Sequence, residues 1–204
     1  MAPVTDVSAS RTRIGVLGGT FDPIHHGHLA AASEVCAALR LDKVLIVPTA
    51  VQPFKRDSVS ASEDHRVAMC EKAVRNDARF EVSTVDIDRG GVTYTVDTLG
   101  DLTSQYPDAD LFFITGADSL ARLSEWKDSA QLGNLAQFVG VTRAGHSFPQ
   151  LETAHRVVEA PSLAISSTDI RRRVRAGVPI RYLMPASVVD YISKHELYLG
   201  GLDD

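Results

Sequence analysis

Residues 18–28 read Gly18-Gly19-Thr20-Phe21-Asp22-Pro23-Ile24-His25-His26-Gly27-His28, and this segment sets the order of the elements around it. A short apolar run, Arg13–Leu17, precedes it, and an alanine-rich segment, Leu29–Leu39, follows it. That order predicts a strand, a glycine turn and then a helix. A helix start gathers unpaired backbone N–H groups and the positive end of the helix dipole. We therefore expect an anion such as a nucleotide triphosphate to bind here.

The glycines and histidines of this segment suit phosphate binding. Glycine at positions 18, 19 and 27 removes the Cβ atoms that would keep a phosphate away from the backbone. His25 and His28 stand three residues apart, so both imidazoles can face one site and donate hydrogen bonds to phosphate oxygens. Three of the chain's seven histidines fall within residues 25–28, which favours a shared role over chance surface exposure.

Other glycine or histidine signatures fit less well. A zinc site is disfavoured because no Cys pair and no H-E-x-x-H pattern accompanies the histidines. A dinucleotide-binding dehydrogenase needs G-x-G-x-x-G after the first strand, whereas Gly15-Val16-Leu17-Gly18-Gly19 has a different spacing. No G-x-x-x-x-G-K-[ST] sequence occurs, so a P-loop enzyme is excluded.

Length and composition are those of one α/β domain. The chain has 204 residues and a formal net charge of −5, which argues against broad nucleic-acid binding. No apolar run approaches the roughly 20 residues of a membrane span, so we expect no membrane contact. Cys36 and Cys70 are isolated, as in reduced proteins, so we expect a cytoplasmic location. We expect a disordered tail at residues 1–12, which are polar and small, before a single domain at 13–204.

Apolar runs alternate with helical patterns along the rest of the chain. The candidate strands are Arg13–Leu17, Lys43–Val47, Phe80–Ser83, Leu111–Thr115, Phe138–Thr142 and Arg156–Glu159. The candidate helices are Gly27–Leu39, Ser62–Asn76, Thr95–Gln105, Ala130–Leu135, Thr168–Ala176 and Pro185–Lys194. This alternation predicts a Rossmann-like α/β fold, an open and mostly parallel sheet with helices on both faces. Ligands of such sheets bind beyond the carboxyl ends of the strands, where residues 18–28 and Gly116–Asp118 would lie.

A second segment, Ile165-Ser166-Ser167-Thr168-Asp169-Ile170-Arg171-Arg172-Arg173, also has the chemistry of a phosphate site. Ser and Thr before a helical pattern are ordinary N-caps, but cations in a first helical turn oppose the dipole at a cost of about 0.3–1 kcal/mol each. A bound anion reverses that sign, so we expect Ser167, Thr168 and Arg171 to bind phosphate oxygens. We expect Arg172 and Arg173 to point elsewhere around the helix and to be solvated.

Both segments resemble signatures of known enzymes. His25-His26-Gly27-His28 is similar to the H-x-G-H signature of the nucleotidyltransferase superfamily. The longer GGTFDPIH-x-GH form resembles its bacterial nicotinate-mononucleotide adenylyltransferase branch, and Ile165–Arg171 is similar to the I-S-S-T-x-I-R motif of the same enzymes. The resemblance spans Arg13 to about Leu199, nearly the whole chain.

The resemblance implies a role for each site residue. It assigns ATP to Gly18, Gly19, Thr20, Phe21, His25, Gly27, His28, Ser167, Thr168, Arg171 and Lys55, with His25, His28 and Arg171 as the catalytic residues. It assigns the mononucleotide to Asp22, Thr95, Asp118 and Trp126. Lys55 follows Phe54, which stands where the family usually has His.

The acceptor residues also have more ordinary interpretations. Asp118 could simply cap the helix after its strand, and Trp126 could belong to the core, although its polar neighbours offer no apolar stripe. In the family, the W-K segment stacks the pyridine ring of the substrate, Asp118 would accept ribose hydroxyls and Thr95 would hydrogen-bond the nicotinate carboxylate. Backbone N–H groups at the start of the Thr95 helix favour that carboxylate over an uncharged amide.

The resemblance implies transfer of AMP from ATP to nicotinate mononucleotide, which yields nicotinic acid adenine dinucleotide and pyrophosphate in NAD biosynthesis. It implies Mg²⁺ held mainly by the ATP phosphates and water, and no metal site built from side chains. Nicotinamide mononucleotide and phosphopantetheine are alternative acceptors, and a nucleotide sensor without turnover is an alternative class. The expected partners are these small molecules, with neither nucleic acid nor membrane, and a homo-oligomer is left open.

Overall fold

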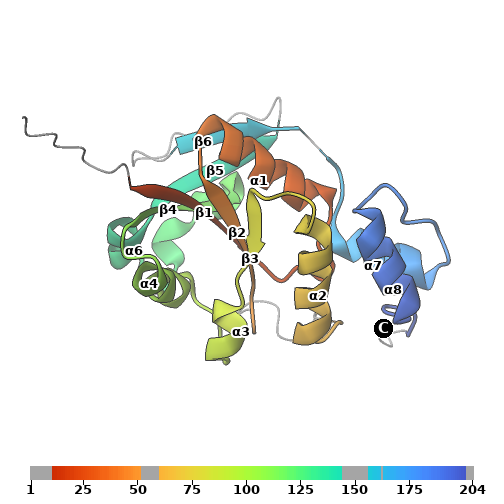
Figure 1. Ribbon diagram of the computed structural model, residues 1–204. Coiled ribbons are helices and arrows are strands. Elements are labelled where there is room, and N and C mark those ends of the chain that lie inside the picture. Colours follow the sequence, from red (N-terminus) through yellow and green to blue (C-terminus); the bar gives the residue numbers. More distant parts are fainter. Residues whose placement is uncertain (1–10, 52–59, 144–155, 162, 201–204) are drawn as a thin grey trace, which may run out of the picture.

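One parallel sheet forms the centre of the protein. The computed structural model describes residues 11–51, 60–143, 156–161 and 163–200. The strands run in the order β3-β2-β1-β4-β5-β6, and every ladder between them is parallel (Figure 1). They are β1 (Thr12–Gly19), β2 (Lys43–Pro48), β3 (Phe80–Val82), β4 (Ala109–Gly116), β5 (Gln137–Arg143) and β6 (Arg156–Ala160). The predicted Rossmann-like sheet and all six predicted strands are confirmed.

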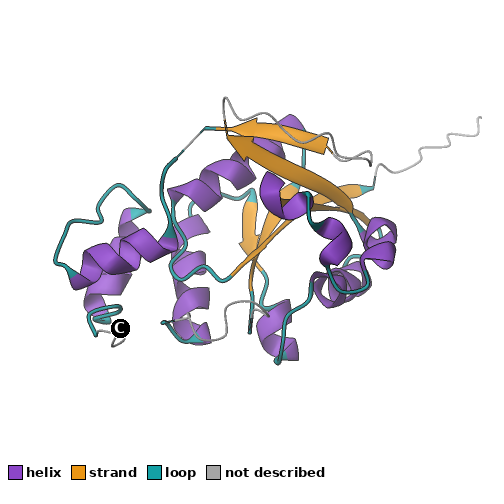
Figure 2. Ribbon diagram, turned by 180° about the vertical axis from the view of Figure 1, so that it is seen from behind, coloured by secondary structure: helices purple, strands orange, loops and turns teal. Residues whose placement is uncertain are grey.

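Helices lie on both faces of the sheet (Figure 2). The longer ones are α1 (His26–Ala38), α2 (Glu63–Val74), α4 (Thr95–Gln105), α6 (Ser129–Leu135), α7 (Ser167–Arg175) and α8 (Ala186–Lys194), and each matches a predicted helix to within two residues at either end. The elements not predicted are α3 (Val85–Arg89), α5 (Ala117–Leu120) and the 3-10 helix η1 (Leu123–Glu125). Each is too short to show a helical period in the sequence. None of the helices in the described ranges is long and apolar enough to cross a membrane.

The core has two apolar clusters, one on each face of the sheet. Side chains alternate along a strand, so neighbouring residues of β1 enter different clusters. Val16 packs with Leu99 of α4 in one cluster, and Leu17 packs with Val35 of α1 in the other. The end of β1 is thereby fixed from both sides, which holds the segment that follows it in a defined place.

The folded unit begins slightly earlier than predicted. Thr12 is the first residue of β1, and Arg11 Nε pairs with Asp110 Oδ1 at 3.1 Å. The predicted tail is therefore too long by these two residues, because Thr12 belongs to β1 and Arg11 is ion-paired to β4. Residues 1–10 lie outside the described residues.

The strand order reverses between β1 and β4. β1 pairs with β2 on one side and with β4 on the other, so the chain leaves β1 toward one edge of the sheet and leaves β4 toward the opposite edge. Such a reversal opens a crevice at the carboxyl ends of the two strands. Gly19 and Gly116 end β1 and β4, so residues 18–28 lie at this crevice as predicted.

Candidate active site

Helix α1 begins directly after the turn that leaves β1. His25 is its N-cap, and His28 lies in its first turn. The two imidazole rings stack with 3.7 Å between their centroids and 21° between their planes. The backbone N–H of His25 donates to Nδ1 of His28 at 3.3 Å. This bond requires the His28 tautomer with its proton on Nε2, so that nitrogen is the donor of the neutral ring.

His25 sits in a drier environment. Its side chain is only 5% exposed. Burial, with a smaller contribution from His26, lowers the pKa of His25 from 6.5 to about 4, so the ring is neutral at physiological pH. The His25 side chain faces the backbone N–H of His28 in a capping box, although the contact of its Nδ1 falls outside hydrogen-bond geometry.

Two glycines of the segment make room for aromatic rings. A Cβ on Gly27 would lie 3.0 Å from the His25 ring, and a Cβ on Gly19 would lie 3.0 Å from the Phe21 ring. Phe21 is buried and has a φ of 50°, in a region that bulky residues rarely adopt. The glycines therefore serve the packing of the protein's own rings, and the predicted backbone approach of a phosphate comes in addition.

A cavity of about 590 Å³ opens between the first turns of α1 and α7, and we call it the α7 cavity. Its wall includes every predicted ATP residue within the described ranges: Gly18, Gly19, Thr20, Phe21, His25, Gly27, His28, Ser167, Thr168 and Arg171. Lys55 lies in residues 52–59, outside the described residues. Two segments far apart in the chain thus meet around one hollow.

Direct hydrogen bonds fasten α7 to the turn after β1. Ser167 Oγ donates to the carbonyl oxygen of Pro23 at 2.8 Å. Arg171 Nη1 donates to the carbonyl oxygen of Asp22, also at 2.8 Å. The Arg171 side chain is 13% exposed, and its Nε is buried with no partner among the described residues. The guanidinium is therefore held at the cavity wall with donor capacity left over.

The other arginines of the segment have a different partner. Arg172 and Arg173 both pair with Asp169, the acidic residue in the first turn of α7. The Arg173 pair joins Nε and Oδ2 at 2.6 Å. Asp169 favours the positive end of the helix dipole, so it offsets two of the three cations that the sequence makes conspicuous. Neither arginine lines the α7 cavity, and their side chains are 73% and 36% exposed, so the expectation that both point elsewhere and are solvated is confirmed, with the pair to Asp169 in addition.

A second cavity, of about 890 Å³, opens against the start of α4, and we call it the α4 cavity. Thr95 and Trp126 both line it, as does Tyr94. The Trp126 ring packs edge-on against Phe113 and Phe138, with centroid distances of 5.9 and 6.1 Å. Trp126 thus belongs to the core and to the cavity wall, so its two interpretations are not exclusive.

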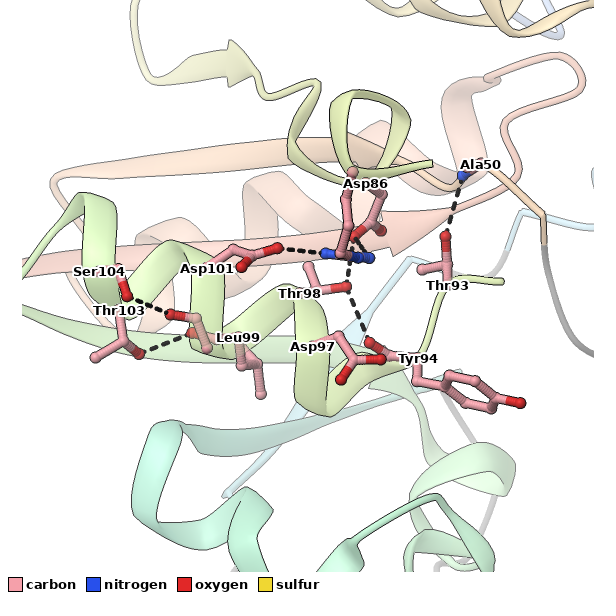
Figure 3. A network of polar contacts seen from close by, with 12 residues as sticks. Ala50, Asp86, Thr93, Tyr94, Asp97, Thr98, Leu99, Asp101, Thr103 and Ser104 are labelled. Atoms are coloured by element: carbon pink, nitrogen blue, oxygen red, sulfur yellow. Dashed lines mark hydrogen bonds and ion pairs between the residues drawn. The ribbon is translucent and has the colours of Figure 1, made fainter. Parts of the chain in front are cut away.

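A hydrogen-bonded network supports the start of α4 (Figure 3). Thr98 Oγ1 donates to Asp86 Oδ1 at 2.7 Å and lies 3.2 Å from the carbonyl oxygen of Tyr94. Arg89 Nη2 pairs with the same Asp86 oxygen at 2.6 Å. Asp86 is 1% exposed, and this burial raises its pKa while Thr98 and Arg89 favour the ionised form. The network holds the first turn of α4 in place beside the cavity.

The structure places neither Asp22 nor Asp118 in the wall of the α4 cavity. Asp22 is 2% exposed, borders the α7 cavity instead of the α4 cavity, and uses its carboxylate to accept hydrogen bonds from its own chain. Asp118 is exposed and lines neither cavity. Ser119 and Arg122 line the α4 cavity instead. These two stand three residues apart on one side of a helical turn, and that turn carries Asp118 to another side.

Reasoning from the sequence missed three buried polar residues. Thr49 lines the α4 cavity, and its Oγ1 has no hydrogen-bond partner in the described part of the chain. Asp86 lines the same cavity. Arg66 is 1% exposed and donates from Nη1 to the carbonyl oxygen of Thr20 at 2.8 Å. Thr49 could have been found, because it directly follows β2 at the same edge of the sheet, whereas nothing in the helical pattern marks Arg66.

The two cavities share a wall at the crevice between β1 and β4. The residues that border both are Leu17, Gly18, Gly19, His28, Ile114, Thr115 and Gly116. His28 therefore faces both hollows, whereas His25 borders the α7 cavity and not the α4 cavity. An atom bound in one cavity can meet an atom bound in the other beside His28.

Comparisons with known proteins identify relatives of this chain. The profile of the cytidylyltransferase-like family matches residues 16–173. A probable nicotinate-nucleotide adenylyltransferase of Clavibacter michiganensis is 54% identical over 198 residues, which cover 96% of this chain and 98% of the relative. Another, from Streptomyces coelicolor, is 56% identical over 189 residues, or 90% of this chain and 100% of the relative.

The chain belongs to the nicotinate-nucleotide adenylyltransferase family. Solved structures agree with the fold of this adenylyltransferase. The nicotinic acid mononucleotide adenylyltransferase of Plasmodium falciparum, complexed with NaAD, aligns with a TM-score of 0.74 and 20% identity over 94% of this chain and 100% of that chain. The same protein complexed with APC gives a TM-score of 0.72. At this identity the likeness supports the architecture alone.

Proposed function

We propose that this protein transfers AMP from ATP to nicotinate mononucleotide, giving nicotinic acid adenine dinucleotide and pyrophosphate. The observation that carries the proposal is the shared wall of the α7 and α4 cavities at Gly18, Gly19 and His28. A transfer between two nucleotides requires two binding sites whose reacting ends touch. The family to which the chain belongs supports the same reaction.

The α7 cavity is suited to ATP. Its wall combines the start of α1 with hydroxyls and the guanidinium of α7, including Ser167, Thr168 and Arg171. Helix starts, hydroxyls and Arg are the usual protein ligands of phosphate oxygens. We assign the β- and γ-phosphates to Ser167, Thr168 and Arg171, and the α- and β-phosphates to His25 and His28.

The α4 cavity is suited to the mononucleotide. Trp126 offers an aromatic surface for the pyridine ring, and Thr95 begins a helix whose N-terminal backbone groups favour an anion. That anion is the nicotinate carboxylate, which gives the acid substrate an advantage over its amide. Lys127 also lines this cavity and pairs with Asp97 at 3.1 Å, so positive charge is available at its rim.

The chemistry needs no general base. The second pKa of a phosphate monoester is about 6, so the attacking 5′-phosphate is largely a dianion at neutral pH. One of its oxygens forms a bond to the α-phosphorus of ATP while the bond from that phosphorus to the bridging oxygen of pyrophosphate breaks. Catalysis then consists of in-line positioning and of stabilising charge on the leaving group. We assign to His28, which lies on the shared wall, the donation of Nε2–H to the transferring phosphate.

Mg²⁺ fits this site as a partner of the phosphates. No group of three or more His, Cys, Asp or Glu side chains in the described ranges could hold a metal ion. Mg²⁺ commonly keeps several waters and binds through substrate phosphates instead of an all-protein cage. When bound in that way it neutralises charge on the triphosphate.

Pyrophosphate release tests the proposal. The protein is incubated with ATP and Mg²⁺ and, in parallel, with nicotinate mononucleotide, nicotinamide mononucleotide or phosphopantetheine. We expect release mainly with nicotinate mononucleotide. Release with another acceptor would keep the ATP site and replace the acceptor, and ATP binding without release with any acceptor would favour a nucleotide sensor.

We also propose a cytoplasmic location for the reaction. Cys36 and Cys70 are both free and buried in the structure. Unpaired thiols are typical of a reducing compartment, and ATP is available there.

A further inference from the structure

The C-terminal segment reaches the turn after β1 through a buried hydrogen bond. The hydroxyl of Tyr198 donates to Oδ1 of Asp22 at 2.8 Å, across 176 positions of the sequence. Both side chains are buried, at 8% exposure for Tyr198 and 2% for Asp22. Burial raises the pKa of Tyr198, so its hydroxyl stays protonated and remains a donor.

Asp22 in turn holds Arg171. The carbonyl oxygen of Asp22 accepts from Arg171 Nη1 at 2.8 Å, and Oδ2 of Asp22 lies 3.7 Å from the same nitrogen. The backbone N–H groups of Ser60 and Ala61 donate to Oδ2 and Oδ1 at 2.8 and 3.2 Å. The C-terminal segment, the start of α7 and the chain before α2 therefore meet at one carboxylate.

The lengths of these contacts indicate how Tyr198 affects Arg171. A hydroxyl and two backbone donors satisfy the Asp22 oxygens at hydrogen-bond distance, while the ion pair with Arg171 stays open at 3.7 Å. The guanidinium of Arg171 therefore remains available to a ligand in the cavity that it lines. Without the Tyr198 hydroxyl, Oδ1 of Asp22 would keep only the longer bond from Ala61 at 3.2 Å, and the cation that pairs with Asp22 among the described residues is Arg171. Closure of that pair would compete with a phosphate for the guanidinium.

We propose that Tyr198 is a positioning residue for Arg171 that acts through Asp22. By donating to Asp22, it keeps the Asp22 carboxylate from pairing closely with Arg171, so the guanidinium stays available to a phosphate. The proposal rests on the proposed function in one respect, that Arg171 binds the phosphates of ATP. Asp22, Arg171 and Tyr198 do not line the α4 cavity, so the effect should reach ATP and spare nicotinate mononucleotide.

Tyr198→Phe tests this inference, with Tyr191→Phe as the matched control. Tyr191 is another tyrosine near the C-terminus whose hydroxyl bonds to α2, at 3.0 Å from His65 Nδ1, and it lines neither cavity. The ATP Kd is measured by calorimetry without acceptor, and both KM values by pyrophosphate release. We expect Tyr198→Phe to raise the Kd and KM for ATP about fivefold or more. The KM for nicotinate mononucleotide should stay within about twofold, and Tyr191→Phe should leave all three values unchanged.

A purely structural role gives another pattern. It would lower the Tm of Tyr198→Phe and leave the Kd for ATP as in the wild type, and that result overturns the inference, as does an equal rise in both KM values. If Tyr198→Phe does not fold, Asp22→Asn replaces it, since the amide keeps the shape and removes the charge. In a folded Asp22→Asn protein no carboxylate can close on Arg171, so the Kd for ATP should not rise, and a raised Kd would also overturn the inference. Because calorimetry needs no turnover, the inference can stand or fall even if no acceptor yields pyrophosphate.

Discussion

The imidazole rings of His25 and His28 stack face to face across the first turn of α1, with 3.7 Å between their centroids. The two rings have different surroundings. His25 is buried with a pKa lowered to about 4, whereas His28 borders both cavities and accepts a backbone N–H at Nδ1. Because His25 is neutral, the pair cannot consist of two imidazolium rings, which would repel each other at this distance.

Replacement of His28 should affect turnover more than ATP binding. We expect His28→Ala to lower kcat by about 10²–10³, the usual cost of losing one donor to a transition-state oxygen. Calorimetry should still detect ATP. His26→Ala is the control, because the His26 ring lines neither cavity and its contact to Leu183 is made by the backbone. An unchanged kcat in His28→Ala would remove His28 from the mechanism.

The pKa of His25 predicts a dependence of stability on pH. The folded pKa of about 4 lies below the unfolded value of 6.5, so the unfolded chain binds the proton more readily. The contribution of His25 is therefore fully present above pH 6.5 and is lost as the pH falls toward 4, by up to roughly 3 kcal/mol.

Urea unfolding of the ligand-free protein between these pH values measures this effect. His25→Asn should flatten the slope of unfolding free energy against pH. His195→Gln should leave it unchanged, since His195 is exposed. The same slope in His25→Asn and in the wild type would contradict the assignment.

Trp126 should influence the acceptor and not ATP. Trp126→Leu removes an aromatic surface from the α4 cavity, and we expect the KM for nicotinate mononucleotide to rise about tenfold, given that a stacked base is worth about 1–3 kcal/mol. The KM for ATP should not change. Phe138→Leu is the control for packing, since Phe138 contacts Trp126 but lines neither cavity. An equal change of both KM values in Trp126→Leu would argue against stacking.

The Asp86 network should respond unequally to the loss of its two outer members. Arg89→Met leaves the buried Asp86 carboxylate without its cation, and we expect a loss of about 1.5–3 kcal/mol in unfolding free energy. Asp101→Asn removes the other partner of Arg89, which is 42% exposed, and should cost less than about 1 kcal/mol. Chemical denaturation distinguishes the two, and similar small losses would mean that Asp86 does not depend on Arg89.

Most of the fold could be predicted from local patterns in the sequence. The strands are short apolar runs between turn residues, and the longer helices show a clear period, so both could be placed from the sequence. The α7 cavity could also be predicted, because two phosphate-binding segments were expected at the carboxyl ends of parallel strands. The geometry brings together every one of these predicted residues that the structure describes.

The exceptions depend on contacts that no local pattern contains. Asp22 stands in the phosphate-binding segment, yet its role is decided by Tyr198, 176 positions away. Asp118 follows a strand as a ligand residue would, yet the phase of one short helical turn points Ser119 toward the α4 cavity instead. Arg66 looks like a surface cation of an amphipathic helix until the carbonyl oxygen of Thr20 is found beside it.

The wall that the two cavities share at Gly18, Gly19 and His28 also affects how the products leave. In the proposed reaction, pyrophosphate would lie in the α7 cavity alone, whereas the dinucleotide would have one half in each cavity. When one half lets go, the other keeps it near its site at an effective concentration on the order of millimolar, so it rebinds before both halves are free. The dinucleotide should therefore dissociate last, and analogues that join an adenosine and a pyridine nucleotide through a short bridge should occupy the enzyme longer than either half does.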